Sequence, residues 1–188
     1  MKRIVWTFGL ISGAVLAVMM VITMSFIGHI GDKGLIIGYT TMVVSFLMVF
    51  VGIKTYRDNV LGGLIGFGKA FQVGILIAVI GSMCYVATWE VMFYGSDVGE
   101  KVLAQMVEQE KTRSASQQEN DAKVAEMKKF QERYRSNPLF NAALTFIEVF
   151  PVALVITLVS AGVLKRKRDG SAVVPTGARS ATEGPALH

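Results

Sequence analysis

Three ionisable side chains stand out because they interrupt or border long apolar runs of the sequence. Glu148 lies inside the last apolar run, Glu90 lies near the end of the third, and His29 follows the first. An aspartate at the centre of a membrane-spanning helix costs about 2.5 to 3.5 kcal/mol on insertion scales, so such a group needs something to offset that cost. These residues are therefore the candidates for a small intramembrane proton or cation site.

Glu148 is the strongest of the three candidates. If the hydrocarbon begins near Leu139, Glu148 lies about 13 Å deep at 1.5 Å per residue, too far for easy snorkelling to water. Pro151 cannot donate to the carbonyl of Ile147 and is expected to kink the helix, which leaves a free acceptor near the carboxyl group. The sequence leaves two readings open: a functional ion site, or a neutral carboxyl that is satisfied within the core.

Other kinds of chemistry find little support in the sequence. The segment from Gly63 to Ala70 nearly matches the phosphate-binding pattern G-x-x-x-x-G-K-[ST], but Ala70 has no hydroxyl for magnesium and no strand precedes the loop. Cys84 is the single cysteine, and no cluster of histidine and cysteine predicts a metal. We therefore expect no enzyme activity, no cofactor, no bound metal and no nucleotide.

The composition predicts a membrane protein. Hydrophobic residues make up 52% of the 188 residues and charged residues 18%, which is too apolar for an ordinary water-soluble domain. About 20 helical residues cross a hydrocarbon core of ~30 Å. Four apolar runs reach that length, at residues 4–27, 35–53, 67–94 and 139–164. The rival reading of the first run is a cleaved signal peptide, but its apolar length disfavours that.

The basic residues predict the orientation of these spans. Lys and Arg cluster beside one set of span ends, at residues 2–3, 54–57, 69 and 165–168, whereas the first hairpin carries only Lys33. Positive charge in short flanks is typical of the cytoplasmic side. We therefore expect cytoplasmic termini. The net charge of +5 is then explained by topology and anionic lipid, not by nucleic acid.

The long polar segment at residues 97–136 is expected to be helical and extracytoplasmic. Asp97 and Glu100 have the spacing of a capping box, which favours a helix start. One frayed helix and two helices with an elbow fit the pattern equally well. Pro138 should end this segment before the fourth span, since the residue before a proline avoids the helical region. The tail at residues 169–188 has the composition of a disordered cytoplasmic segment.

Small residues recur at four-residue intervals in three of the apolar runs. The first run has Gly9 and Gly13, the third has Gly74 and Ala78, and the fourth has Ala153. Such faces let helix backbones approach closely. We expect most of them to pack within one bundle, with homodimerisation through one of them as the alternative.

The cytoplasmic turn and the fourth span carry a recognisable pattern. It comprises Lys54-Thr55-Tyr56-Arg57-Asp58-Asn59, then Gly62-Gly63, then Phe67-Gly68-Lys69-Ala70-Phe71, and later Asn137-Pro138-Leu139-Phe140 and Glu148-Val149-Phe150-Pro151. Across residues 4–168 the chain resembles the bacterial membrane family catalogued as domain of unknown function 4199. The resemblance implies four spans, a long loop between the third and fourth, and no reaction. It makes Arg57, Asp58 and Lys69 worth testing, although topology and helix ends also explain them.

Together these observations predict an all-α, multi-pass protein of the bacterial inner membrane with a membrane domain at residues 1–168. The expected function is a non-enzymatic interaction or scaffold role that presents the outer segment to another envelope protein or to a second copy. The alternative is a proton- or cation-coupled carrier or channel subunit that uses Glu148.

Overall fold

The computed structural model describes residues 1–25, 33–113 and 117–166, and its regular structure there is helical apart from one isolated β-bridge. His29 and the tail at residues 169–188 lie outside the described residues. The helices are α1 (Lys2–Ser25), α3 (Lys33–Val60), α4 (Phe67–Gly95), α5 (Val98–Arg113), α6 (Gln117–Ser136) and α7 (Pro138–Leu164).

Within the described ranges, four helices are long and apolar enough to cross a membrane: α1, α3, α4 and α7. They contain 24 to 29 residues, so at 1.5 Å per residue they are about 36 to 44 Å long, longer than a hydrocarbon core of ~30 Å. The four spans expected from the sequence are therefore present as helices, which indicates a multi-pass membrane protein.

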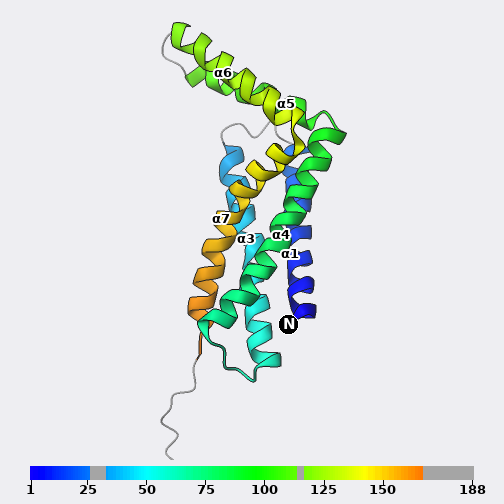
Figure 1. Ribbon diagram of the computed structural model, residues 1–188, viewed down its shortest axis with the longest axis vertical. Helices are drawn as coiled ribbons and strands as arrows, with labels where there is room; N and C mark the ends of the chain where they lie inside the picture. Colours follow the sequence, from blue (N-terminus) through cyan, green and yellow to red (C-terminus); the bar gives the residue numbers. More distant parts are fainter. Residues whose placement is uncertain (26–32, 114–116, 167–188) are drawn as a thin grey trace, which may run out of the picture.

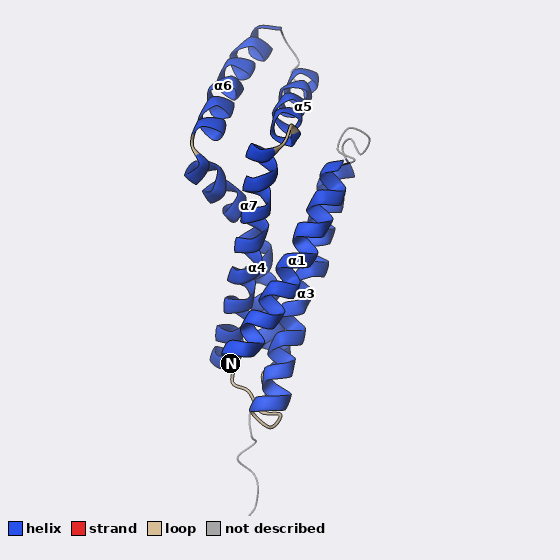
Figure 2. Ribbon diagram, turned by 90° about the vertical axis from the view of Figure 1, so that its right-hand side faces the viewer, coloured by secondary structure: helices blue, strands red, loops and turns tan. Residues whose placement is uncertain are grey.

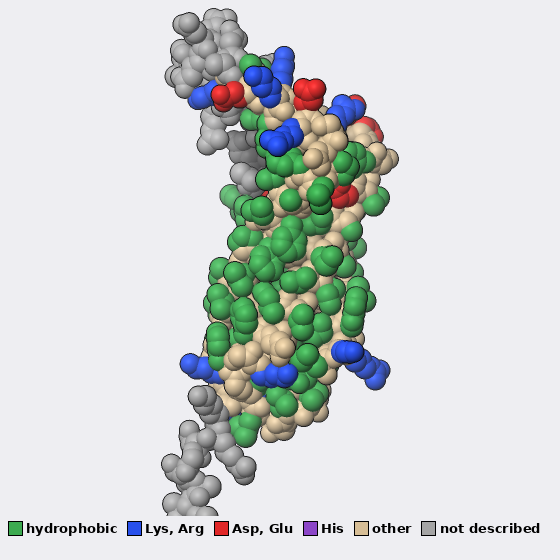
Figure 3. Space-filling model, in the orientation of Figure 1, with side chains coloured by type: hydrophobic (Ala, Val, Ile, Leu, Met, Phe, Trp, Pro, Cys, Tyr) green, Lys and Arg blue, Asp and Glu red, His purple; other side chains and the backbone are tan. Residues whose placement is uncertain are grey.

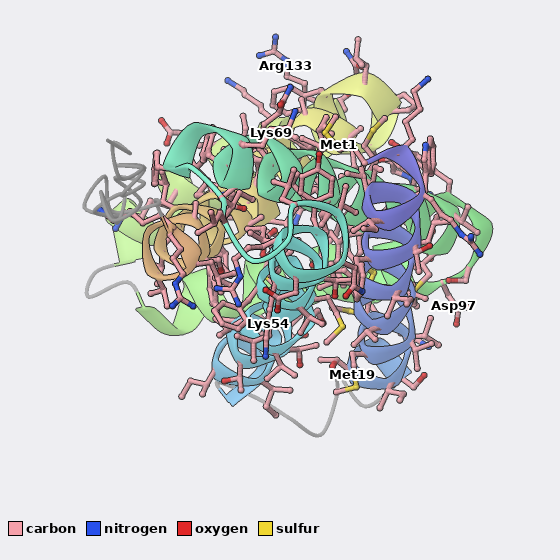
Figure 4. The ribbon with its side chains drawn as sticks, turned by 90° about the horizontal axis from the view of Figure 1, so that it is seen from below. Met1, Met19, Lys54, Lys69, Asp97 and Arg133 are labelled. Carbon is pink, nitrogen blue, oxygen red and sulfur yellow. The ribbon has the colours of Figure 1, made fainter. Side chains whose placement is uncertain are left out.

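The four long helices form one bundle (Figure 1). α4 packs against both α1 and α7, α3 packs against the same two helices and more sparsely against α4, so α1 and α7 occupy opposite corners. Figure 4 looks along the bundle from the end that carries Met1, Lys54 and Lys69. The hairpin formed by α5 and α6 continues from α4 and α7 at the other end, away from both described chain ends (Figures 1 and 2).

Small residues bring α1 and α4 into close contact. A Cβ placed on Gly13 would lie 2.5 Å from the Cβ of Cys84, and one on Gly9 would lie 2.8 Å from the Cβ of Ile80. Gly74 is enclosed in the same way by side chains of α3 and α7. The faces around Gly9, Gly13 and Gly74 therefore pack within one bundle, as expected from the sequence.

The centre of the bundle is apolar with a few internal hydrogen bonds. Phe46, Val49 and Ile53 of α3 are fully buried, and the hydroxyl of the buried Ser12 on α1 donates to the carbonyl oxygen of Ser45 at 3.0 Å. An interhelical hydrogen bond of this kind fixes the register of two apolar helices, because hydrocarbon offers no alternative partner.

At the end of the bundle near the termini, α3 continues to Val60, beyond the end predicted at Ile53. Arg57 and Asp58 are therefore in the last helical turn and not in a loop. Their charged side chains can reach the surface from a helix, so the backbone keeps its helical hydrogen bonds. Gly62 and Gly63 then make the turn with φ of 65° and 92°, a region that favours glycine. Ile65 pairs with Arg166 through two backbone hydrogen bonds of 3.0 and 2.8 Å, which ties this turn to the end of α7.

The segment between the third and fourth spans contains two helices within its described residues. α5 and α6 lie side by side, since Gln131 donates to the carbonyl oxygen of Leu103 at 2.6 Å. The helix start expected near Asp97 is present, but the capping box is not: the Asp97 carboxylate pairs with Lys101, and Glu100 pairs with Arg135 of α6. Asn137 accepts from the backbone N–H of Phe140 and so begins α7 directly after α6.

Charged side chains are separated along the molecule (Figure 3). Basic side chains gather near the end of the bundle that carries Met1 and the end of α7, the middle of the visible face is apolar, and acidic and basic side chains are mixed at the other end. This distribution matches four spanning helices with wet regions at both ends.

Candidate functional site

The structure places Glu148 on α7 and Glu90 on α4. The residue Glu148 is exposed and forms no hydrogen bond or ion pair with a described residue. It follows the fully buried Asn141 by seven positions, about two helical turns, so the two side chains leave α7 in nearly the same direction. The carboxyl groups of Glu148 and Glu90 both act on the same phenol, that of Tyr134.

Glu90 lies near the outer end of α4 and is half-buried. Its Oε1 atom is enclosed and has no hydrogen-bond partner among the described residues. His29, the third candidate, is outside the described residues. Within those residues there is no group of three or more His, Cys, Asp or Glu side chains that could hold a metal ion.

The residues singled out at the other end of the bundle are engaged locally. Arg57 donates through Nε to Asp58 at 2.6 Å, and the Lys69 ammonium donates to the side-chain oxygen of Gln72 at 3.0 Å. Lys69 thus lies in the first turn of α4 and bonds to a residue of the same helix. Pro151 is exposed and lies inside α7, which continues through it from Pro138 to Leu164.

A polar cluster that the sequence did not reveal joins three helices where the hairpin meets the bundle. The indole N–H of Trp89 on α4 donates at 2.9 Å to the hydroxyl of Tyr134 on α6 and at 2.9 Å to Oδ1 of Asn141 on α7. The hydroxyl of Thr145 lies 3.5 Å from that of Tyr134 and donates to the Asn141 carbonyl oxygen at 3.0 Å. We call Trp89, Tyr134, Asn141 and Thr145 the junction.

The hydrogen bonds of the junction fix the orientation of the Asn141 side chain. Trp89 has only a donor, so the amide oxygen of Asn141 must face it. The Nδ2 group consequently points elsewhere and, with Asn141 fully buried, finds no partner among the described residues. An unpaired buried amide costs about 1 to 3 kcal/mol, which offsets part of the stabilisation from the hydrogen bond with Trp89.

Aromatic packing surrounds the junction and encloses it. The ring centroid of Phe93 lies 5.6 Å from that of Trp89 and 5.3 Å from that of Tyr134, and the ring of Phe130 lies 5.8 Å from Tyr134. The hydroxyl of Tyr94 also donates to the backbone carbonyl of Tyr134 at 3.3 Å. The base of α6 is therefore held to α4 by both rings and hydrogen bonds.

Burial raises the pKa of Tyr134 above its ordinary value of 10.0. Hydrogen bonds from Thr145 and Trp89 act in the opposite direction, and the carboxyl groups of Glu148 and Glu90 add to the increase. The phenol is therefore neutral at physiological pH and can both accept from Trp89 and donate. It cannot serve as a base at neutral pH.

A cavity of about 200 Å³ lies beside the junction, where α4 ends and α5 begins. It is lined by Phe93, Tyr94, Ser96, Gly99, Glu100, Leu103 and Arg135. Its charged side chains, Glu100 and Arg135, already pair with each other at 3.0 Å across the hairpin. The cavity therefore adds a link between α5 and α6, and the Ser96 hydroxyl in its lining donates to the carbonyl oxygen of Met92 at 2.7 Å.

The arrangement can hold the hairpin in a defined position on the bundle. The hydroxyl, amide and indole groups of the junction are hydrogen-bonded to one another, and none is paired with a base in the manner of a catalytic nucleophile. A signal for the junction does exist in the sequence: Asn141 and Thr145 are polar residues four apart within an apolar span, so they share one helix face.

A family profile with the description "Protein of unknown function (DUF4199)" matches residues 7–166 of the chain. No curated protein and no solved structure gives a significant match.

Proposed function

We propose a role for this chain from the premise that it belongs to the DUF4199 family of proteins of unknown function. In this proposal the chain is a non-enzymatic interaction protein of the bacterial inner membrane, and its α5–α6 hairpin recognises another protein of the cell envelope. The hairpin faces the extracytoplasmic side in this proposal, and both termini are cytoplasmic.

The observation that carries the proposal is the junction. A hydrophilic connection between two spans needs no fixed orientation, because water satisfies its backbone groups. Here Trp89 instead joins α4 to both α6 and α7 through a buried, shared hydrogen-bond donor. A buried polar network rigidifies the elements that it joins, so the hairpin is presented in one position, as a docking element requires.

Charge supports the orientation. The described basic residues Lys2, Lys54 and Lys165 lie at the helix ends opposite the hairpin, and short flanks rich in Lys and Arg are typical of the cytoplasmic side. The hairpin carries both signs of charge, as a segment long enough to be translocated with little regard to charge can do.

Photocrosslinking in intact cells tests the proposal. A photoreactive amino acid replaces Met106, which is 39% exposed on α5, and in a second variant replaces the half-buried Met127 on α6. The same reagent at Val18, which is 58% exposed on the bundle surface of α1, is the matched control. We expect both hairpin positions to capture one and the same protein, identified by mass spectrometry as another envelope protein or a second copy, and Val18 not to capture it.

Capture of nothing from either hairpin position would contradict the proposal. Capture of the same products from Val18 as from Met106 would do so as well, because collision in the membrane would then explain the adducts. Accessibility of a cysteine at Met106 to a membrane-impermeant thiol reagent, in a Cys84→Ala background, tests the orientation separately.

A second candidate function is a proton- or cation-coupled carrier that uses Glu148. The observation in its favour is that Glu148, within a spanning helix, has no hydrogen bond or ion pair with any described residue. In proteoliposomes, Glu148→Gln is expected to abolish a flux that the unaltered protein carries; equal fluxes, or none in either protein, would remove this candidate.

A further inference from the structure

Glu148 is the only charged residue of α7 between Pro138 and Leu164. It is ten positions from Pro138, about 15 Å from the end of α7 that carries the hairpin, and 17 positions, about 25 Å, from Lys165 at the opposite end. An ionised carboxyl within hydrocarbon needs a partner, whereas a protonated carboxyl is neutral. A proton that reaches Glu148 therefore has a shorter path from the hairpin side.

Polar side chains occupy α7 between Glu148 and the hairpin. Asn141, Thr145 and Glu148 follow one another at intervals of four and three residues, which places them along one side of the helix with about 5 to 6 Å between successive Cβ atoms. Asn141 is fully buried and Thr145 is 4% exposed. The hydroxyl of Thr145 therefore comes one helical turn from the buried amide on one side and one turn from the carboxyl group on the other.

The phenol of Tyr134 on α6 extends this row toward water. Its hydroxyl lies 3.5 Å from that of Thr145, and either atom can donate. Tyr134 is half-buried at the base of the hairpin. The carboxyl groups of Glu148 and Glu90 both contribute to the raised pKa of Tyr134, so this phenol is within electrostatic reach of the two of them.

The amide of Asn141 adds unused hydrogen-bonding capacity to the row. Its Oδ1 atom accepts from Trp89 at 2.9 Å, and its enclosed Nδ2 group has no partner among the described residues. Buried polar groups without a protein partner are the usual attachment points of internal water. Asn141 thus leaves a free donor next to Thr145, which packing alone does not explain.

Among the described residues, no comparable row leads from Glu148 toward the other end of the bundle. The buried hydroxyl groups on that side belong to Ser82, Thr157 and Ser160. None of them bonds to a side chain of another helix, and the hydroxyl of Thr157 donates to the carbonyl oxygen of Ala153 in its own helix. The link between Tyr134 and Thr145 has no counterpart there.

The groups that face Glu148 favour a proton over a metal cation. Every helix that packs closely against α7 contributes titratable groups: α4 has Tyr85 and Glu90, α6 has Tyr134, and α3 has Tyr39. Tyr85 interacts electrostatically with Glu148, and Tyr39 with Tyr85. A metal cation requires several oxygen or nitrogen ligands, and the described part of the chain holds no group of three or more His, Cys, Asp or Glu. One carboxylate suffices for a proton.

We propose that Glu148 binds a proton that it receives from the water on the hairpin side, through the hydroxyl groups of Tyr134 and Thr145. Each hydroxyl accepts one proton as it gives up another, so only the carboxylate changes its charge when it becomes a carboxylic acid. The inference rests on the second candidate function, since it names the ion and the side of entry of that carrier. It requires binding only, and no flux.

A hydrophobic carbodiimide tests which side supplies the proton, because it reacts with protonated carboxyl groups within membranes. The full chain, with Cys84→Ala and Met106→Cys, is placed in sealed lipid vesicles, and an impermeant biotin reagent marks the molecules whose hairpin faces outward. The pH is varied on one side and held constant on the other. Mass spectrometry of the marked molecules measures the modified fraction of Glu148.

We expect the modification of Glu148 to follow the pH on the hairpin side. It should fall about tenfold for each further pH unit on that side once the carboxyl group is mostly ionised, and it should respond little to the pH on the side of the termini. The ratio of the two responses reflects the relative rates of proton exchange with the two sides, not the speed of the carbodiimide reaction.

Two threonines of α7 form a matched pair for testing the route. Both are buried, and each hydroxyl donates to the carbonyl oxygen four residues earlier, at 3.0 Å for Thr145 and 2.7 Å for Thr157. Thr145→Val and Tyr134→Phe should each lower the ratio of the two responses about tenfold, as expected when a hydrogen-bonded step is lost. Thr157→Val and Thr145→Ser, which keeps the hydroxyl, should leave the ratio unchanged.

Several results would overturn the inference. They are modification that follows the pH on the side of the termini, modification that follows neither pH, and no modification of Glu148 at all. Equal ratios in Thr145→Val and Thr157→Val would also overturn it. Modification that follows the hairpin-side pH, in a protein that carries no flux, would support the inference and remove only the carrier.

Discussion

Replacement of Trp89 by phenylalanine removes the shared donor of the junction and keeps an aromatic ring in its place. Tyr134 then loses the group that donates to its hydroxyl at 2.9 Å, and Asn141 loses the donor to Oδ1 at 2.9 Å. Asn141 Oδ1 keeps a weaker contact with the Thr145 hydroxyl at 3.3 Å. The perturbation therefore acts mainly on the attachment of α6.

The expected loss of stability is about 2 kcal/mol. One hydrogen bond that is lost from a buried site contributes about 0.5 to 1.5 kcal/mol, and a smaller ring at a position that is 8% exposed adds a small cavity. For a chain of this size 1 kcal/mol corresponds to about 2 to 4 °C. The melting temperature in detergent, followed by circular dichroism, should thus fall by about 4 to 8 °C. Trp6→Phe, at a position that is 58% exposed, is the matched control and should leave it nearly unchanged.

A double-mutant cycle with Tyr134→Phe isolates the hydrogen bond. Each single change removes the contact between Trp89 and Tyr134, so the double variant should be less destabilised than the sum of the two, by about 1 kcal/mol. Additive effects within about 0.3 kcal/mol would refute the view that this bond attaches the hairpin.

Three further predictions concern packing and titration. Gly13→Ala should destabilise the bundle by about 1 to 3 kcal/mol in the same melting assay, because its Cβ would lie 2.5 Å from that of Cys84, whereas Gly38→Ala, with nothing within 4 Å, should not. A titration followed at 295 nm compares the unaltered protein with Tyr134→Phe, and the difference should show a tyrosine that ionises above pH 10.0. Neutral Tyr134 contributes stability that is fully present below pH 10.0 and is lost as the pH rises through the raised pKa. The hydrogen bond from Lys101 lowers the pKa of Asp97 below 3.8. The protection factors of the amides in the first turn of α5, which correct the exchange rates for the intrinsic effect of pH, should therefore fall as the pH falls through the lowered pKa, and Asp97→Asn should remove that dependence.

The number of spans could be predicted because a helix must satisfy its own backbone in hydrocarbon, which requires a long apolar run. The end of α3 could not, since Arg57 and Asp58 look like loop residues in sequence and yet continue the helix to Val60. Asp97 and Glu100 predicted the helix start correctly, but they form ion pairs with Lys101 and Arg135 in place of the reciprocal capping box.

The site was harder to predict, because it depends on direction around a helix and on contacts between distant segments. A count of residues along α7 gives the depth of Glu148 but not which groups of other helices lie near its carboxyl group. The partners in the junction are 45 and 52 positions apart in the chain, so no local sequence pattern connects Trp89 to Tyr134 or to Asn141.

The most direct test of the central claim combines the junction with the photocrosslinking assay. The photoreactive amino acid at Met106 is compared in cells that produce equal amounts of the unaltered junction and of Trp89→Phe. If the junction presents the hairpin to its partner, the partner adduct should fall about tenfold or more in Trp89→Phe, as expected for a loss near 2 kcal/mol, and should stay unchanged in Trp6→Phe. An adduct of equal yield in all three proteins would contradict the claim that a fixed hairpin is what the partner recognises.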